Sequence, residues 1–91
     1  YNGEWKNGNM HGNGTYTYAN KDQYIGEWTD NKKNGNGKYT YANGDQYIGT
    51  YENNKRNGEG KFVLANGDTF LRTYQDGKKI LDTNSNNYNL M

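Results

Sequence analysis

The fold is decided by residues 24–46, which read YIGEWTDNKKNGNGKYTYANGDQ. The same pattern occurs in the 23 residues before this stretch and in the 23 residues after it. Segments 1–23, 24–46 and 47–69 align without gaps, a partial fourth unit follows at 70–83, and the Asn-rich stretch 84–91 has the character of a loose tail. Repeats of this length indicate units that bury their apolar surface by stacking on their neighbours.

Each unit contains two stretches that alternate like β-strands. In YIGEW, Tyr24, Gly26 and Trp28 fall on one face of the strand. Ile25 and Glu27 fall on the other face. GKYTY alternates in the same way, whereas the intervening TDNKKNGN is polar and predicts a loop, so each unit is a β-hairpin. The Asn-Gly pairs of the ANGD segments 42–45 and 65–68 predict tight primed turns between hairpins. Lys21 replaces that glycine in the first unit and predicts a slightly altered turn.

The composition indicates an aromatic core. Only 30% of the 91 residues are hydrophobic, and aromatic residues make up half of that share, at 15% of the chain. A lone hairpin is too small to be stable in water, so at least three must associate. We therefore expect an all-β protein, an elongated single-layer antiparallel sheet of tandem 23-residue hairpins. Ile80 and Leu81 are candidates to cover its last hairpin.

The motifs YIGEW, KNGNG, RNGEG and KYTYANGD resemble the membrane occupation and recognition nexus repeat, known as MORN. The likeness extends from residue 1 to about residue 74. The first unit is the most similar, through Tyr1, Gly3, Trp5, Gly8, His11, Gly12, Gly14, Tyr16 and Tyr18. Later units replace Gly8 and His11 by Asn, in the region expected to form a loop. The resemblance implies a non-catalytic module of junction proteins, lipid kinases, ciliary spoke proteins or cytoskeletal scaffolds, which binds proteins, dimerises or contacts phospholipid.

Three basic pairs recur with the repeat and predict a ladder of positive charge along one edge of the sheet. Successive pairs would lie roughly 10 Å apart, two strands on, which is close to the Debye length in cell-like salt. Such a ladder suits acidic protein segments or phosphoinositide head groups, although lysines in turns also serve solubility. The six residues are Lys32, Lys33, Lys55, Arg56, Lys78 and Lys79. The first unit interrupts the ladder with Asn9 and Met10.

The aromatic face of a single-layer sheet is a second candidate surface, because no second sheet covers it. Any groove left there would accept an apolar helix or an extended peptide. The alternative is that twist and neighbouring rings cover most of this face. The candidate residues are Trp5, Tyr16, Trp28, Tyr39, Tyr51, Phe62 and Tyr74. The ends of the sheet offer a third route, self-association by edge pairing.

Several chemistries are disfavoured. The regularly spaced Asp22, Asp45 and Asp68 invite a calcium interpretation, but each lies alone in its turn, where turn chemistry explains it. His11 is the only histidine, there is no cysteine, and the single serine, Ser85, lies in the tail, so we expect no catalytic site, metal or cofactor. The glycine runs lack the context of a phosphate loop.

The remaining features bear on partners and compartment. A formal charge of +1 gives no field for nucleic acid, and the lack of cysteine fits a reducing compartment. The longest apolar run, at residues 62–65, is too short to cross a membrane. We therefore expect a cytoplasmic, non-enzymatic scaffold that binds a protein, cut from a larger chain and associated with membrane or cytoskeleton. The alternative is peripheral attachment to anionic phospholipid through the basic ladder.

Overall fold

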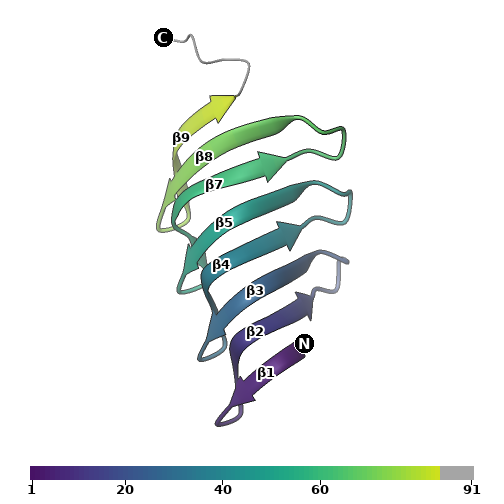
Figure 1. Ribbon diagram of the computed structural model, residues 1–91, viewed down its shortest axis with the longest axis vertical. Coiled ribbons are helices and arrows are strands. Elements are labelled where there is room, and N and C mark those ends of the chain that lie inside the picture. Colours follow the sequence, from purple (N-terminus) through teal and green to yellow (C-terminus); the bar gives the residue numbers. More distant parts are fainter. Residues whose placement is uncertain (85–91) are drawn as a thin grey trace.

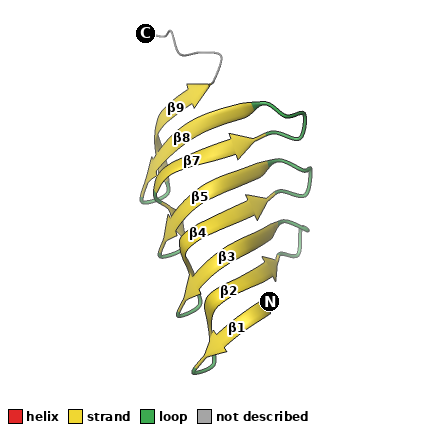
Figure 2. Ribbon diagram, viewed as in Figure 1, coloured by secondary structure: helices red, strands yellow, loops and turns green. Residues whose placement is uncertain are grey.

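The computed structural model describes residues 1–84, which form one open antiparallel β-sheet of nine strands (Figure 1). The described residues contain no helix, and both faces of the sheet are left without a second layer (Figure 2). This confirms the all-β, single-layer prediction. The strands are β1 (Asn2–Lys6), β2 (Asn9–Thr17), β3 (Gln23–Thr29), β4 (Lys32–Thr40), β5 (Gln46–Glu52), β6 (Lys55–Arg56), β7 (Gly58–Val63), β8 (Thr69–Gln75) and β9 (Lys78–Asn84).

The strands follow one another through the sheet as a simple meander. Their order is β1-β2-β3-β4-β5-β7-β8-β9, with β6 paired to β5 beside β7. Hairpins therefore pair internally and with the next hairpin, so hydrogen bonding is continuous along a body of 49 × 25 × 17 Å. Strands β8 and β9 complete a fourth hairpin, and the predicted tail begins within β9, since Asn84 is its last residue. The rest of that tail, 85–91, lies outside the described residues.

The expectation that Ile80 covers the last hairpin is wrong, because this side chain is 58% exposed. Lys79 pairs with Tyr74, and Leu81 pairs with Thr73. Ile80 is thus the extra residue of a β-bulge, and a bulged residue has no partner on the neighbouring strand to pack against. The side chain of Leu81 lies outside the described part of the chain.

The long polar loop expected from TDNKKNGN is also wrong. Thr29 pairs with Lys32, so the connection between β3 and β4 is the two residues Asp30 and Asn31. Both have positive φ, 48° and 70°, as a type I′ turn requires. Asp and Asn tolerate this conformation because their short side chains bond locally. The rest of the polar stretch therefore belongs to β4.

The connections between hairpins differ from the predicted primed turns as well. In ANGD, only Gly44 has a positive φ, 99°. Its N–H donates to the Tyr41 carbonyl oxygen at 2.9 Å, and the Tyr41 N–H donates to the Asp45 carbonyl oxygen at 2.8 Å. These bonds define a three-residue loop, a type I turn that ends in a left-handed residue. Lys21 takes the same position with φ 77° and the same two bonds. The first turn therefore has the geometry of the other two, and the expectation of an altered turn is wrong.

Because Lys21 is held in the left-handed region, Lys21→Gly will stabilise the protein. A side chain costs roughly 1–2 kcal/mol there, and the greater freedom of glycine in the unfolded chain offsets part of the gain. We expect the free energy of unfolding to rise by about 1 kcal/mol in urea denaturation. The reciprocal change, Gly44→Lys, should lower it by a similar amount. A neutral or destabilising Lys21→Gly would contradict this account of the turn.

The paired glycines of each unit have two separate functions. In the second unit, Gly35 has φ 103° and lies where the β3–β4 register shifts. There the Glu27 carboxylate accepts the Asn36 N–H at 2.8 Å. Gly37 instead lies flat beneath the ring of Tyr24, with no room for a Cβ atom.

The tyrosines that lie on these glycines form the core together with the neighbouring rings. Tyr24 and Tyr47 are fully buried, at 0% exposure, and Trp28, Tyr51 and Tyr74 are nearly so. Tyr24 meets Trp28 and Tyr51 edge-to-face, with ring centroids 5.1 Å apart in both pairs. Edge-to-face contact brings the positive edge of one ring to the negative face of the next. A chain of such contacts runs along the molecule through Trp5, Tyr1, Trp28, Tyr24, Tyr51, Tyr47 and Tyr74.

Candidate functional site

The residues of the predicted aromatic groove divide between core and surface. Trp28, Tyr51 and Tyr74 are only 4%, 5% and 8% exposed, so they pack inside the protein and are out of reach of a partner. Tyr16, Tyr39 and Phe62 are half-buried against this core, and Trp5 is 58% exposed. The surface that remains open on this side, which we call the aromatic face, consists of the half-buried rings of Tyr16, Tyr18, Tyr39, Tyr41 and Phe62.

The six residues of the predicted basic ladder do not form one exposed row. The first member of each pair, Lys32, Lys55 and Lys78, is exposed beside a hairpin turn. The second members of the first two pairs, Lys33 and Arg56, are half-buried on the aromatic face. The cause is that each strand begins directly after the two-residue turn, so both members of a pair lie within a strand. Consecutive side chains of a strand point to opposite faces of the sheet. Lys79 occupies the corresponding position on β9 and is exposed.

Lys33 lies among four tyrosine rings. Its Nζ atom is 5.3–5.7 Å from their centroids and donates a hydrogen bond of 3.3 Å to the Tyr18 hydroxyl. Such distances are those of cation–π attraction. Burial, followed by the nearby charge of Arg56, lowers the pKa of Lys33. The four rings are those of Tyr18, Tyr24, Tyr39 and Tyr51.

Arg56 repeats this arrangement one unit further on. Its Cζ atom lies 4.2 Å from the centroid of the Tyr47 ring, and its guanidinium donates to the hydroxyls of Tyr74 and Tyr41. Although burial opposes its charge, contacts with the hydroxyls of Tyr41 and Tyr51 raise the pKa of Arg56. Met10 packs on the core at the same place in the first unit. This position therefore supplies a long side chain that covers the rings, and in two units it ends in a cation.

The hydroxyls of Tyr24, Tyr39 and Tyr47 stay protonated near neutral pH. Burial raises the pKa of Tyr47 to about 12, against a partly opposing effect of Arg56. Burial also raises the pKa of Tyr24 and Tyr39. Neutral phenols at pH 7 are poor nucleophiles and bases, but they present hydrogen-bond donors and acceptors.

The repeated aspartates join one inter-hairpin turn to the next. Asp22 is 8% exposed, and its carboxylate accepts the Ala42 N–H and the Tyr39 hydroxyl, both at 2.8 Å. The Tyr39 bond, followed by those from Ala42 and Asn20, outweighs burial and lowers the pKa of Asp22. Asp45 accepts the equivalent Ala65 N–H at 2.8 Å.

Acid will therefore weaken the protein through Asp22. The pKa of Asp22 is lower in the folded state than in the unfolded state. The stability that its carboxylate contributes is therefore complete at pH values above the ordinary Asp pKa near 3.9, and it is lost as the pH falls through the folded-state pKa. Asp22→Asn should lower the melting temperature at pH 7, and the gap to the wild type should narrow as the pH falls below the ordinary pKa near 3.9. Asp45→Asn is the matched control and should have a smaller effect, because Phe62 stands where Tyr39 would donate. Equal, pH-independent losses in both variants would contradict this mechanism.

Metal ligation, the lone histidine and membrane spanning also bear on function within residues 1–84. No three His, Cys, Asp or Glu side chains in this part of the chain are grouped to hold a metal ion. The Nδ1 atom of His11 is buried without a hydrogen-bond partner among the described residues. No helix able to cross a membrane is formed by these residues.

Sequence reasoning missed that Lys33 and Arg56 cover the core, and that Tyr24 and Tyr47 are its most buried members. The available signal was Met10, an apolar residue at the position of the later cations. Comparison with curated proteins found no match. The family model of the MORN repeat matches residues 1–23, 24–46 and 47–69, which is most of the chain. With this match and the tandem hairpins of the structure, the chain belongs to the MORN repeat family.

Proposed function

We propose that this chain is a non-catalytic protein-interaction module whose aromatic face binds an acidic segment of a protein partner. The observation that carries the proposal is the pair of half-buried cations, Lys33 and Arg56, held among rings one repeat apart. Within residues 1–84, the side-chain hydrogen bonds of both cations go to tyrosine hydroxyls and not to carboxylates. Positive charge in partly desolvated surroundings gains from a carboxylate that a partner brings.

The half-buried rings support the same function. Tyr18, Tyr39 and Tyr41 surround the two cations, with centroids of neighbouring rings 4.9–5.6 Å apart. Aromatic side chains offer large contact area with a polar end, and they are enriched at protein interfaces. A partner would thus meet apolar ring surface, hydroxyl groups and half-buried positive charge together. Catalysis is not part of the proposal, because the protonated phenols provide neither nucleophile nor base at neutral pH.

The test is selection of peptides from a displayed random library against the purified protein. We expect enriched peptides to carry Asp or Glu. These peptides should lose at least roughly tenfold in affinity for the double variant Lys33→Met, Arg56→Met. Methionine keeps the covering side chain, as Met10 shows in the first unit. The matched control is Lys32→Met, Lys55→Met, which removes the same charge from exposed neighbours and should bind nearly as well as the wild type. Enriched peptides without acids, or equal losses in both variants, would refute the proposal.

Attachment to anionic phospholipid is the second candidate function. Lys32, Lys55 and Lys78 are exposed in successive hairpins, two strands or roughly 10 Å apart. Such a row suits a charged surface more than a single ligand. Sedimentation with phosphoinositide liposomes tests it. Lys32→Gln, Lys55→Gln, Lys78→Gln should abolish salt-sensitive binding, whereas Lys33→Met, Arg56→Met should not. No binding by the wild type would exclude this candidate.

A further inference from the structure

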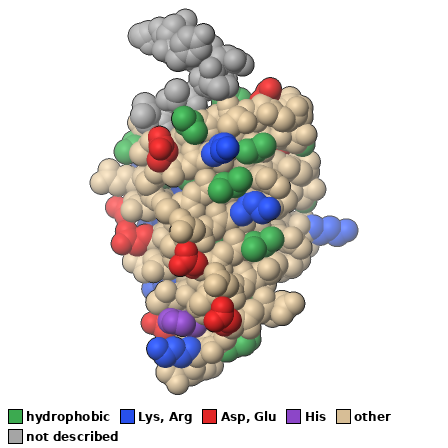
Figure 3. All heavy atoms as spheres, in the orientation of Figure 1, with side chains coloured by type: hydrophobic (Ala, Val, Ile, Leu, Met, Phe, Trp, Pro, Cys, Tyr) green, Lys and Arg blue, Asp and Glu red, His purple; other side chains and the backbone are tan. Residues whose placement is uncertain are grey.

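A second row of side chains crosses the sheet on the face opposite the rings. Ile25 pairs with Lys38, and Lys38 pairs with Ile48. Ile48 in turn pairs with Lys61, and Lys61 pairs with Leu71. Aliphatic and lysine side chains thus alternate over β3, β4, β5, β7 and β8, and Figure 3 shows green and blue side chains alternating on this face. We call Ile25, Lys38, Ile48, Lys61 and Leu71 the aliphatic–lysine row.

The members of the row are available to a partner. Ile25, Ile48 and Leu71 are 43%, 41% and 44% exposed, so each presents apolar surface to solvent at regular spacing. Lys61 is exposed and Lys38 partly exposed. Within residues 1–84, neither lysine makes an ion pair or hydrogen bond. The row therefore combines apolar contact area with two ammonium groups that make no ion pair within residues 1–84.

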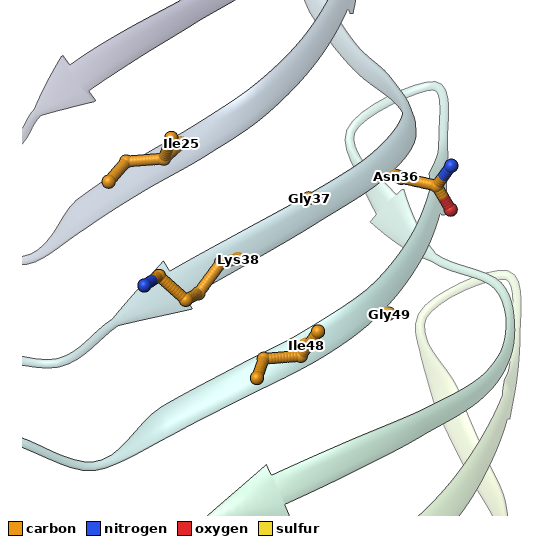
Figure 4. Close-up of a pocket in the computed structure, with 6 residues that line it drawn as sticks. All are labelled: Ile25, Asn36, Gly37, Lys38, Ile48 and Gly49. Atoms are coloured by element: carbon orange, nitrogen blue, oxygen red, sulfur yellow. The ribbon is translucent and has the colours of Figure 1, made fainter.

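A shallow depression lies beside the row (Figure 4). Ile25, Lys38 and Ile48 stand along one side of it, and the backbone at Gly37 and Gly49 forms its floor. These two glycines have no side chain on either face, and their Cβ positions would point to the tyrosines on the other side. Asn36 also lines the depression. A rod-shaped segment can therefore rest against the row along the length of the sheet.

The spacing of the row discriminates between kinds of occupant. Strands are ~4.8 Å apart, so like residues, two strands on, recur every ~9.6 Å. In an α-helix, positions seven residues apart are ~10.5 Å apart on the same side, and positions three or four apart lie ~5 Å along. An extended strand repeats its face every ~6.7 Å and would lose register after one contact. A helix matches the row with a modest tilt.

We propose that the aliphatic–lysine row docks an amphipathic α-helix of a protein partner, laid across the strands along the row. The helix carries apolar residues at intervals of seven, which pack on Ile25, Ile48 and Leu71. Acidic residues midway between them meet Lys38 and Lys61. Charge complementarity selects this helix, because a basic or uncharged helix would leave both ammonium groups without a partner. This surface lies on the opposite side of the sheet from the aromatic face, so the helix proposal can be tested independently of the acidic-segment proposal.

The test uses a labelled helical peptide of about 21 residues, which is roughly 30 Å long. It carries Leu at every seventh position and Glu midway, with Ala and Gln elsewhere. Fluorescence anisotropy measures its binding to the whole chain, and circular dichroism should show gain of helix. Lys38→Glu, Lys61→Glu should weaken binding at least roughly tenfold. The matched charge reversal Lys32→Glu, Lys55→Glu should change it less than about threefold.

Two further peptides test the spacing of the apolar residues in the helix and the sign of its charge. A peptide of the same composition with Leu at every sixth position should bind at least roughly tenfold more weakly than the seven-residue design. A peptide with Lys in place of Glu should bind the Lys38→Glu, Lys61→Glu protein more tightly than it binds the wild type. Peptides that lose affinity for the Lys33→Met, Arg56→Met variant should not compete with the helical peptide for the wild type, which separates this surface from the aromatic face.

Three results would overturn the proposal. The first is equal binding of the six-residue and seven-residue peptides. The second is equal loss in the two charge-reversal variants, which would indicate non-specific attraction. The third is absence of peptide binding while vesicles of phosphatidylcholine and phosphatidylserine bind and Lys38→Glu, Lys61→Glu removes that binding, which would assign the row to a lipid surface.

Discussion

Gly37→Ala will destabilise the protein by about 3 kcal/mol, near the upper end of the cost of overpacking a core. A Cβ atom at this position would lie inside contact distance of the Tyr24 ring. Tyr24 cannot move aside, because it is fully buried, lies between Trp28 and Tyr51, and donates from its hydroxyl to the Glu27 carbonyl oxygen at 3.1 Å. In a domain of this size the expected fall in melting temperature is roughly 10–20 °C.

The controls for this change are the adjacent positions of the same strand. Asn36→Ala and Lys38→Ala alter side chains that lie on the opposite face and should cost less than about 1 kcal/mol. Gly60→Ala should repeat the effect in the third unit, because its Cβ would meet Tyr47 in the same way. If Gly37→Ala melts within a few degrees of the wild type, the close packing of tyrosine on glycine is not what holds the sheet.

Arg56→Ala will destabilise the protein by about 2 kcal/mol, whereas Lys55→Ala will stay within about 0.5 kcal/mol of the wild type. The two residues are neighbours of similar charge, but only Arg56 lies over the rings, close to Tyr47 and hydrogen-bonded to Tyr41 and Tyr74. Truncation removes a covering side chain as well as a charge. Urea denaturation of the two variants measures the difference directly.

Methionine separates the two contributions of Arg56. Arg56→Met keeps an apolar chain of similar length, as Met10 provides in the first unit. We expect it to recover at least half of the loss seen in Arg56→Ala. A loss equal to that of alanine would show that charge, and not cover of the rings, is what this residue contributes. Equal behaviour of Lys55→Ala and Arg56→Ala would contradict the placement of Arg56 itself.

The repeated hairpins, the single layer and the aromatic core could be predicted because they depend on local rules. A period of 23 residues together with two-residue alternation fixes which residues form strands and which rings share a face. None of these inferences depends on the location of a particular turn.

The structure differs from the prediction wherever turn location mattered. Asn-rich TDNKKNGN reads as a loop by composition, yet a type I′ turn needs only Asp30 and Asn31. Because strands alternate, the position of the turn decides which face each following side chain occupies. Placing the turn at 30–31 would have put Lys33 opposite Trp28 on the ring side, and Lys32 outside. The basic ladder therefore divides into exposed and ring-covering members for a reason that composition does not reveal.

The carboxylates show a second limit of sequence reasoning. Asp22, Asp45 and Asp68 were each assigned to their own turns. There each donates its backbone N–H to the side-chain oxygen of the Asn two residues earlier, and its carboxylate accepts from that side-chain amide. Asp22 and Asp45 in addition bond the next turn, 20 residues on. A contact at that separation follows only from the stacking of units, which a single unit does not contain.

The central claim is that the second cation of the first two basic pairs belongs to the aromatic side of the sheet and that the first cation does not. Nuclear magnetic resonance of the side-chain methylene protons tests this most directly, because aromatic rings shift protons that lie over their faces upfield. The account predicts upfield-shifted resonances for Lys33 and Arg56 and unshifted resonances for Lys32 and Lys55. Unshifted resonances for all four would contradict it, and the basic ladder would then be one exposed row of charge.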